Sequence, residues 1–529
     1  MVAALAECAL LLEAEDEVAV ATRELAAGTR VIIGDTEVEL PGAVPRGHKL
    51  AVRAVPQGSP VHKYGQPIGV ATVDIAVGDH VHVHNLGMHD AARSYEFGTA
   101  RSRPAAPTGP DDQSGSAASG ATHDPDRSPR TFLGYHRADG RVGTRNHIAV
   151  LTSVNCSAST AKMIAEQFRG PALDAFGNVD GVLALTHQSG CGLVQGSRGA
   201  DTLVRTLRGY ARHANIGGLL VLGLGCEMVP VRSLVDDLDL PADTLVEVLT
   251  IQDTGGVRAT VQAGVERIRA MLPVLDARRR APAPVAELIL GLNCGGSDGY
   301  SGITANPALG VASDRLVAAG GTSILAETPE VFGAEHLLTR RAVSAEVGQR
   351  LLDRLDWWRD YTRAGGGSMD NNPSPGNKAG GLTTILEKSL GAVAKAGRAE
   401  LSAVYEYAVP VTSRGFVFMD TPGYDPVSVT GIVAGGATVV CFTTGRGSVL
   451  GSRPAPCLKL ATNSEMYHHM AADMDINCGR VVDGTATLAE VGDEIFERIL
   501  AVASGERTAS EELYLGQEEF VPWPLGAVT

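Results

Sequence analysis

The sequence predicts an α/β protein with a small β domain in front, and three observations lead to this fold class. From Phe132 onward, short apolar runs alternate with segments of helical periodicity, which is typical of parallel sheets with crossover helices. Before about Gly98, strand-like runs are separated by glycine and proline turns, the pattern of a small barrel or clip. Between these parts, residues 101–130 contain hardly an apolar side chain, so they cannot bury enough surface to offset the entropy of ordering.

The chain therefore divides into four predicted parts: a β-clip domain over residues 1–98, a flexible linker over 99–130, and two Rossmann-like α/β domains over 131–280 and 281–529. Strands of the first part are expected at 29–33, 49–55, 67–73 and 79–84. In the first α/β domain, helices are expected at 158–168, 200–213 and 257–271. In the second, strands are expected at 288–292, 322–326, 415–419 and 437–442, and helices at 342–363 and 488–504.

Composition excludes some classes of partner. A net charge of −15 and a pI near 5.4 argue against nucleic acid or an anionic membrane as the main partner. No apolar run reaches transmembrane length and no secretory leader is recognisable, so a cytoplasmic protein is expected. The 8 cysteines are scattered along a long chain, which favours free thiols or metal ligands over a disulfide framework.

Four cysteines share one construction, in which an apolar run ends at or just before the thiol: Cys156, Cys191, Cys226 and Cys294. Open α/β sheets bind ligands beyond the carboxyl ends of their strands, so at least three of the four thiols are expected to share one metal or cluster site. The alternative is four independent buried cysteines, because cysteine is often buried without a further role.

The first domain is rich in histidine, with 6 of the chain's 14. His82 and His84 are expected on one face of a strand, because side chains alternate, and His80 would join them if the strand reaches it. These histidines are candidates for metal ligation or acid/base chemistry. The alternative is a solvated edge strand.

Glycine-rich loops carrying single cations explain how an acidic protein could hold an anion. Lys378 lies in the loop 365–381 before an expected helix, and Arg446 lies in TTGRGSVLGS. Arg145 lies in GRVGTRN, and Ser297 and Asp298 follow Cys294 among glycines. Each loop alone is more often structural; together they predict a carboxylate site.

The longer motifs carry a resemblance to a known family. GYHRADGRVGTRN, THQSGCG, GLGCE, CGGSDGYSGITANPALG, NPSPGNKAGGLTTILEKSLGAVAKAG, FMDTPG, FTTGRG and MDINCGR resemble, in order, the signatures of altronate/galactarate dehydratases. GHKLAVR and VHKYGQPIGVATVDIAVGDHVHVHN look like the SAF domain that accompanies them.

The resemblance implies dehydration of a sugar acid, such as altronate or galactarate, to a 2-keto-3-deoxy acid. It also implies a metal requirement: iron, as Fe²⁺ or an iron–sulfur cluster, or another divalent ion such as Mn²⁺. The expected metal ligands are Cys191, Cys226 and Cys294, with Cys156 in reserve; the competing set is His48, His82 and His84 together with a substrate oxygen. The expected acid/base residues are His187, Glu227 and His48. The expected substrate-binding residues are Lys49, Lys63, Arg145, Ser297, Asp298, Lys378 and Arg446.

Two other functions stay open at this point, and a homo-oligomer, in particular a dimer, is expected. One is a lyase of the same family that acts on another 2-hydroxy acid such as sulfolactate. The other is a sugar-acid binding protein without catalysis. A nicotinamide dehydrogenase is disfavoured, because Gly223-Leu224-Gly225 lacks the third glycine of a dinucleotide fingerprint and runs into Cys226.

Overall fold

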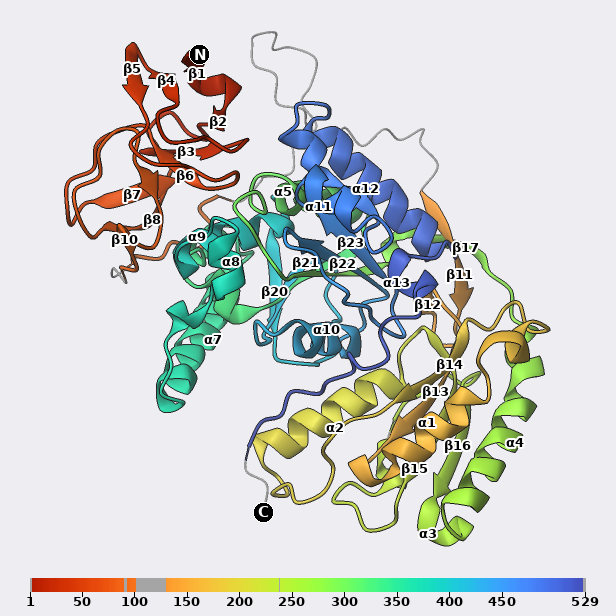
Figure 1. Ribbon diagram of the computed structural model, residues 1–529. Coiled ribbons are helices and arrows are strands. Elements are labelled where there is room, and N and C mark those ends of the chain that lie inside the picture. The colour runs from red at the N-terminus through yellow and green to blue at the C-terminus, as the bar shows by residue number, and fades with distance from the viewer. Residues whose placement is uncertain (1, 90–92, 101–129, 237, 527–529) are drawn as a thin grey trace, which may run out of the picture.

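The computed structural model describes residues 2–89, 93–100, 130–236 and 238–526 (Figure 1). Most of the predicted linker, 101–129, lies outside the described residues. Figure 1 shows the β domain at one end of the molecule, a seven-stranded sheet in the middle and a four-stranded sheet at the other end. Among the described helices, none combines the length and the apolar character that crossing a membrane requires.

The first domain is built from three small sheets. Their strands are β1 (Val2–Ala4), β4 (Arg30–Ile33) and β5 (Thr36–Glu39); β2 (Ala9–Leu10), β3 (Val18–Ala21), β6 (Lys49–Ala51) and β9 (His80–Val81); and β10 (Leu86–Gly87), β8 (Gln66–Ala71) and β7 (Pro60–Lys63). Most of the strand pairs are antiparallel, as short strands separated by turns predict.

One expected strand is wrong in its extent. Strand β9 ends at Val81, and residues 82–85 form a turn in which the amides of Asn85 and Leu86 donate to the His82 carbonyl. His82 and His84 therefore do not share a strand face. The turn gathers the rings of His80, His82 and His84 by a different route, described below.

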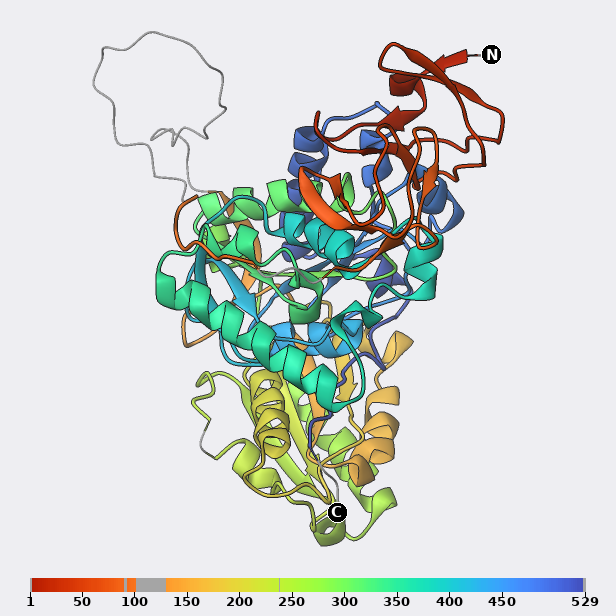
Figure 2. The same cartoon turned by 90° about the vertical axis from the view of Figure 1, so that its left-hand side faces the viewer.

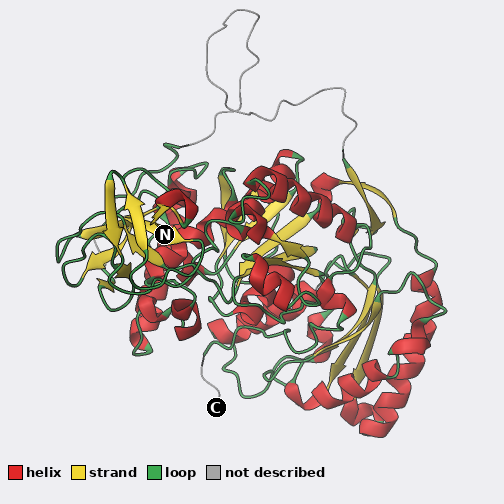
Figure 3. Cartoon of the chain, turned by 45° about the horizontal axis from the view of Figure 1, so that its top comes forward, coloured by secondary structure: helices red, strands yellow, loops and turns green. Residues whose placement is uncertain are grey.

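The four-stranded sheet is parallel throughout, in the order β14 (Gly181–Leu185), β13 (His147–Thr152), β15 (Ile216–Gly223), β16 (Leu245–Thr250). Strand β15 is buried along its whole length, as expected for a continuous apolar run between two layers of helices. Helices α1 (Ala158–Glu166) and α4 (Val257–Asp276) pack together on the sheet, whereas α2 (Arg198–Ala211) packs against helix α10 (Asp425–Ala434) of the next unit. Helices flank the strands of both parallel sheets in Figure 3.

The seven-stranded sheet is also parallel throughout. Its order is β20 (Leu401–Tyr405), β21 (Gly415–Met419), β19 (Thr322–Leu325), β18 (Ile289–Cys294), β22 (Val439–Thr444), β23 (Cys457–Ala461), β24 (Ile476–Asn477). Helices α5 (Ala305–Ala318) and α12 (Leu488–Ala503) pack together over one face, and α10 lies against the other (Figure 2). A small antiparallel sheet, β12 (Val142–Gly143), β11 (Thr131–His136) and β17 (Ala281–Pro284), lies between the two α/β units.

The remaining helices, except α3, belong to the part of the chain around the seven-stranded sheet. They are α3 (Ile251–Thr254) beside the four-stranded sheet, and α6 (His336–Thr339), α7 (Ala345–Ala364), α8 (Pro375–Ala379), α9 (Ile385–Val393), α11 (Ser464–His469) and α13 (Ala509–Glu512). Helix α9 is buried on every side, including Glu387 and Lys388. A helix that is buried all round yet carries two adjacent charges must pair each of them inside the protein.

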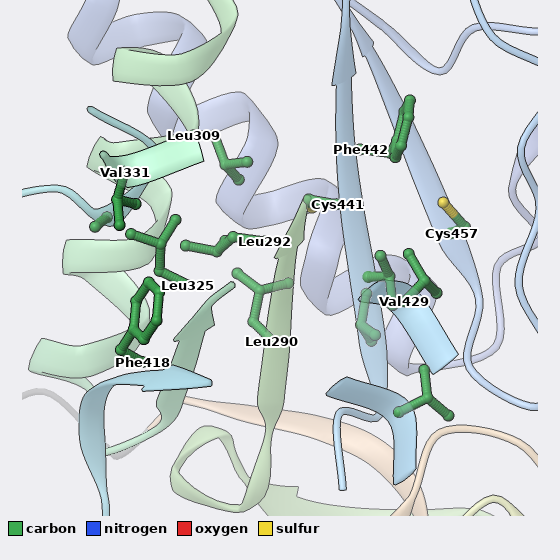
Figure 4. Packing of buried hydrophobic residues seen from close by; sticks show 14 of the residues in the cluster. Leu290, Leu292, Leu309, Leu325, Val331, Phe418, Val429, Cys441, Phe442 and Cys457 are labelled. Atoms are coloured by element: carbon green, nitrogen blue, oxygen red, sulfur yellow. The ribbon is translucent and has the colours of Figure 1, made fainter. Parts of the chain in front are cut away.

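Strand β18 is the centre of the hydrophobic core. Figure 4 shows Leu290 and Leu292 of β18 packed between Leu325 and Phe418 on one side and the β22 and β23 strands on the other. Cys441 and Cys457 are buried in this apolar packing and behave as small hydrophobic residues. After β18 the chain adds β19 on one side and later β22 on the other, so the order reverses at β18 and β22. Ligands of open α/β sheets bind at the carboxyl ends of the strands where the order reverses.

Candidate active site

A cavity of about 560 Å³ opens at this reversal point. The loops after β18, β19 and β22 contribute to its wall, together with the loop before α8 and the start of α10. The polar side chains that line it include Glu330, Asn372, Asn377, Lys388, Asp425 and Arg446. A cavity of this size with two cations and several hydrogen-bonding groups suits a small hydroxylated acid.

Two glycines after β18 make room for the carboxyl group of Asp425. A Cβ atom on Gly295 would lie 2.1 Å from Asp425 Oδ2, so only glycine fits there. Gly296 has φ +61°, which an L side chain rarely adopts. The glycine-rich turn after Cys294 therefore lets a carboxyl group approach the strand end closely.

Lys388, Glu330 and Asn372 form one hydrogen-bonded triangle in the cavity wall. Lys388 Nζ donates to Glu330 Oε1 at 2.5 Å and to Asn372 Oδ1 at 3.0 Å, and Asn372 Nδ2 donates to Glu330 Oε1 at 2.9 Å. Although burial opposes its charge, the neighbouring Lys388 and Lys395 ammonium groups hold the pKa of Glu330 below its usual range. Glu330 is therefore an ionised carboxylate in the free protein.

Behind this triangle lies a second buried group around Cys294. Lys395 Nζ lies 2.7 Å from Cys294 Sγ and 3.0 Å from Glu327 Oε2, and Cys294 Sγ lies 3.4 Å from Glu330 Oε2. Burial, followed by the charge of Glu327, raises the pKa of Cys294 well above its usual value, so Cys294 is a thiol. Glu327 adopts φ +69°, a conformation that non-glycine residues keep mainly where the surroundings enforce it.

Cys294, Glu327 and Glu330 could in principle hold a metal, since one donor atom of each lies within 4.8 Å of the others. The residues do not fit an ion, however. Lys395 bonds both Cys294 and Glu327, and Lys388 bonds Glu330, so ammonium groups already compensate both carboxylates. A divalent cation would bring two further charges beside two buried ammonium groups.

Asp425 is a cavity carboxyl group whose pKa is strongly raised. Burial, and then the nearby carboxylates of Glu327 and Glu330, raise the pKa of Asp425 to about 8. At neutral pH this carboxyl group is protonated and can donate a proton. The cavity thus combines an ionised carboxylate, a protonated carboxyl group and two cations.

A second group of donors lies where the first domain contacts α8. One ring nitrogen of each of His48, His80 and His82 lies within 4.8 Å of the others. His48 Nδ1 lies 3.0 Å from His80 Nε2, and His48 Nε2 lies 3.2 Å from the Ala379 carbonyl oxygen. His84 joins the edge of the group, with its ring centroid 5.4 Å from that of His80. The cation beside this set, Lys49, bonds Glu387 and none of the three rings among the residues that the structure describes, so these residues fit a metal ion.

Lys49 and Lys63 were expected to bind substrate, but the structure places them in the domain contact. Both are buried, and they donate to the two carboxylate oxygens of Glu387 at 2.8 Å and 3.0 Å. Although burial alone would raise it, the two ammonium groups hold the pKa of Glu387 far below its usual range. These lysines tie the first domain to α9 and do not line the cavity.

The other expected substrate residues fall into different places. Arg446 lines the cavity, and Lys378 lies in α8 one residue after Asn377. Ser297 accepts a hydrogen bond from Asn377 through its carbonyl oxygen. The Asp298 carboxylate accepts from Ser301, Thr462 and Asn463 and so orders the loop after β18.

Arg145 requires a correction, because its guanidinium group is fully engaged elsewhere. It is buried, bonds both carboxylate oxygens of Glu511 at 2.7 Å, and donates to the carbonyl oxygens of Thr144, Val502 and Glu506. Its position joins the C-terminal segment to the start of the first α/β unit. A substrate carboxylate would have to displace this buried pair.

The four cysteines do not converge, which corrects the predicted metal set. Cys294 ends β18 of the seven-stranded sheet, whereas Cys156, Cys191 and Cys226 follow β13, β14 and β15 of the four-stranded sheet. The pattern of a strand ending in cysteine recurs in two separate sheets, so it cannot by itself place the thiols together. The three thiols of the four-stranded sheet are exposed.

The loops that carry these three cysteines are hydrogen-bonded to one another. Asn155 N donates to the Ser189 carbonyl at 2.8 Å, and Met228 N donates to the Gly190 carbonyl at 3.0 Å. Within the described ranges, however, no three histidine, cysteine or carboxylate donor atoms of these loops lie within 4.8 Å of each other. Iron binding by Cys156, Cys191 and Cys226 stays a prediction.

The expected acid/base residues His187 and Glu227 hold these same loops. His187 Nε2 donates to the Thr152 carbonyl at 3.0 Å, and its Nδ1 accepts from Ser189 N at 3.2 Å, so both ring nitrogens are used. The Glu227 carboxylate accepts from Ser153 Oγ and Gly225 N. Neither residue is among those that line the cavity at β18.

Sequence reasoning missed Glu330, Asn372, Lys388, Lys395 and Asp425. A signal for two of them was present, because Lys388 and Lys395 interrupt the apolar stretch ILEKSLGAVAK, which cannot be an exposed helix. Charges inside an otherwise apolar helix indicate buried, paired groups. Asp425 and Glu330 had no comparable signal, because each follows an ordinary proline-containing turn.

Comparison with known proteins gives matches to one family in each of the three domains. Three family models match successive parts: the altronate/galactarate dehydratase SAF domain over residues 7–89, the D-galactarate dehydratase/altronate hydrolase second domain over 134–276, and the D-galactarate/altronate dehydratase C-terminal domain over 285–528.

Individual relatives match this chain over nearly the full length of their own sequences. Altronate dehydratase of Bacillus subtilis is 33% identical over 506 residues, 94% of this chain and 95% of that protein. Galactarate dehydratase (L-threo-forming) of Escherichia coli is 36% identical over 93% of this chain and 92% of that protein. The (2R)-sulfolactate sulfo-lyase subunit beta of Chromohalobacter salexigens is 34% identical, over 74% of this chain and 97% of that subunit. The chain belongs to the D-galactarate/altronate dehydratase family.

Proposed function

We propose that this protein is a sugar-acid dehydratase, a hydro-lyase that removes water from a 2,3-dihydroxy carboxylate of the altronate or galactarate type. Relatives that match almost the whole chain are altronate and galactarate dehydratases, whereas the sulfolactate relative matches less of it. The observation that carries the proposal is the cavity at β18, where Lys388 and Arg446 face an ionised Glu330 and a protonated Asp425.

Binding of the substrate carboxylate would fall to the two cations. Arg446 is exposed at the cavity wall, and its guanidinium geometry suits a bidentate carboxylate. Lys388 is already paired with Glu330. A substrate carboxylate that shares Lys388 weakens this pairing, and Glu330 becomes more basic at the moment when a base is needed.

The reaction then needs one base and one acid. Glu330 takes the proton from C2, and the electrons of that C–H bond form the C2–C3 double bond. The C3–O bond breaks, and Asp425 gives its proton to the departing hydroxyl, which leaves as water. The enol product rearranges to the 2-keto-3-deoxy acid. Asn372 and Asn377 offer hydrogen bonds to the sugar hydroxyl groups along the cavity.

Iron or another divalent metal is part of this proposal, because removing a proton beside a carboxylate places negative charge on its oxygens. When bound, such an ion would stabilise that charge as a Lewis acid. The three histidines at the domain contact fit it, whereas Cys294 with Glu327 and Glu330 do not. The dimer expected from the sequence stays a prediction.

Turnover of sugar acids is the direct test. Purified protein, prepared without oxygen and supplied with Fe²⁺, is expected to convert altronate or galactarate to a 2-keto-3-deoxy acid, detected by NMR and by reaction with semicarbazide. Sulfolactate serves as the comparison substrate, with sulfite as the product to measure. Release of sulfite without turnover of any sugar acid would replace the proposal with the sulfo-lyase alternative, and tight binding without turnover would leave a binding protein.

A pH profile tests the acid. Asp425 faces Glu327, Glu330, Lys388 and Lys395, and its pKa of about 8 keeps it protonated at neutral pH. The protonated form donates, so kcat is expected to fall as the pH rises through about 8, and Asp425→Asn is expected to be slow and to lack this fall. If Asp425→Asn kept the same alkaline decline in kcat, another group would be the acid.

A further inference from the structure

We infer that His48, His80 and His82 form a binding site for one divalent transition-metal ion, at the contact between the first domain and α8. The assignment deepens the proposed function and rests on it where it concerns the reaction. The binding itself follows from the geometry of the three imidazoles.

The distance between His48 and His80 is compatible with a shared ion as well as with a hydrogen bond between the two rings. Metal–imidazole nitrogen bonds are about 2.0–2.1 Å long, so two such ligands at right angles are about 3.0 Å apart. His48 Nδ1 and His80 Nε2 are separated by 3.0 Å, and a nitrogen of His82 lies within 4.8 Å of both. A short contact between two neutral imidazoles needs either one shared proton or one shared cation.

The hydrogen bond on the far side of His48 fixes its tautomer. Because the Ala379 carbonyl can only accept, His48 Nε2 carries the proton, and the lone pair of Nδ1 points toward His80. Histidine ligands of metals commonly donate their second N–H to a carbonyl or a carboxylate in this way. His48 is therefore held as a ligand would be held.

His82 supplies an independent observation. Its Nδ1 is buried and has no hydrogen-bond partner among the residues that the structure describes. A buried nitrogen without a partner is rare in native proteins and calls for an explanation. An ion bound at this nitrogen would satisfy it.

The turn after β9 is built to present these rings. Asn85 Oδ1 accepts from His82 N at 2.9 Å, and Asn85 Nδ2 donates to the His80 carbonyl at 3.0 Å. Asn85 is buried, so its amide closes the turn on itself and fixes the backbone on both sides of Val81. As a result, the rings of His80 and His82 stack with centroids 5.4 Å apart and both face His48.

The type of the ligands indicates which metal ions can bind. All three donors are ring nitrogens of imidazoles. Neutral imidazoles favour iron, zinc, copper or nickel over calcium or magnesium. Three protein ligands leave positions open for a carboxylate or hydroxyl oxygen, which is the arrangement of catalytic rather than structural sites.

The site also joins two parts of the chain. All three imidazoles come from the first domain, but the Ala379 carbonyl that orients His48 belongs to α8. Asn377, two residues earlier in α8, lines the cavity at β18. An ion at the histidines would therefore tighten the contact that places the wall of the cavity.

Cobalt(II) binding to the full-length, chelator-treated protein tests the inference without substrate. We expect one Co²⁺ per chain with visible d–d absorption, and at least about 10-fold weaker binding in His80→Asn and in His82→Asn. The matched control is His89→Asn, which changes an exposed histidine of the same domain outside the group and should bind Co²⁺ as the wild type does. Circular dichroism confirms that each variant is folded.

Two further measurements, one on the wild type and one that includes variants, keep the test decisive. Pulsed EPR of the Cu²⁺-loaded protein is expected to show coupling to imidazole nitrogen, and its absence would overturn the site. Iron loaded without oxygen is analysed with acid-labile sulfide in parallel. Iron with sulfide that survives in His80→Asn but is lost in Cys191→Ser would place the metal at the cysteines of the four-stranded sheet instead. Failure to turn over sugar acids, by contrast, would affect the proposed function and not the Co²⁺ result.

Discussion

Replacing Glu330 by glutamine is expected to lower kcat for the sugar acid by about 10²- to 10⁴-fold, the usual contribution of a positioned general base. The amide keeps the shape of the side chain and can still accept from Lys388 and Asn372, which bond Glu330 in the wild type. It cannot take a proton from C2. KM is expected to change little, because Arg446 and Lys388 remain to hold the carboxylate.

Deuterium at C2 of the substrate provides the check on this role. If Glu330 removes this proton, the wild type shows a kinetic isotope effect. The variant Glu330→Gln lacks the base, so its residual reaction is slow in the same proton-removal step. The matched control is Glu406→Gln, which changes a surface glutamate paired with Arg354. A Glu330→Gln enzyme with kcat near that of the control would remove Glu330 from the mechanism.

Replacing Glu387 by glutamine is expected to have the largest effect on stability, a loss of about 3–5 kcal/mol in the free energy of unfolding. Glu387 is buried and lies between Lys49 and Lys63, so its removal leaves two ammonium groups in the interior without a counter-charge. The first domain is expected to loosen from α9 first, because both lysines belong to it.

Urea unfolding and limited proteolysis measure this effect. The control is Glu497→Gln, which changes an exposed ion pair with Arg130 and should cost no more than about 1 kcal/mol. Early cleavage between the first domain and the rest is expected only in Glu387→Gln. Equal urea midpoints for the two variants would contradict the buried-charge account.

Much of the fold could be predicted because the apolar periodicity and the residues that end helices and strands agree along the chain. The run Thr322–Ala326 became β19, Gly415–Met419 became β21, and Leu488–Ser504 became α12 almost residue for residue. These segments have a clear apolar period and a glycine, proline or capping residue at their ends. The strand expected at 79–84 failed because alternation alone does not show where Asn85 turns the backbone back on itself.

The site was harder to predict, since strand ends in different sheets look alike in sequence. Cys294 ends one apolar strand and Cys226 follows another, and only the pairing of those strands separates the two cysteines. Lys49, Lys63 and Arg145 look like free cations in the sequence, yet each pairs with a carboxylate supplied by a distant segment. Arg446 lies in the cavity because its loop follows a strand at the reversal point, which the sheet order alone reveals.

The reversal of strand order at β18 also bears on when the site comes into being during folding. Leu290 of β18 pairs with Ser323 of β19, which follows closely in the sequence and can pair early in synthesis. Its partner on the other side is Val439 of β22, which is far along the chain. Long-range parallel pairing is slow, because the entropy cost of closing the loop between the strands comes before any contact that offsets it. Arg446 and the Gly296 carbonyl that accepts from its amide come together only at that step. A nascent chain therefore carries an open strand edge at its future substrate cavity until β22 joins, and an open edge of this kind can pair with other chains.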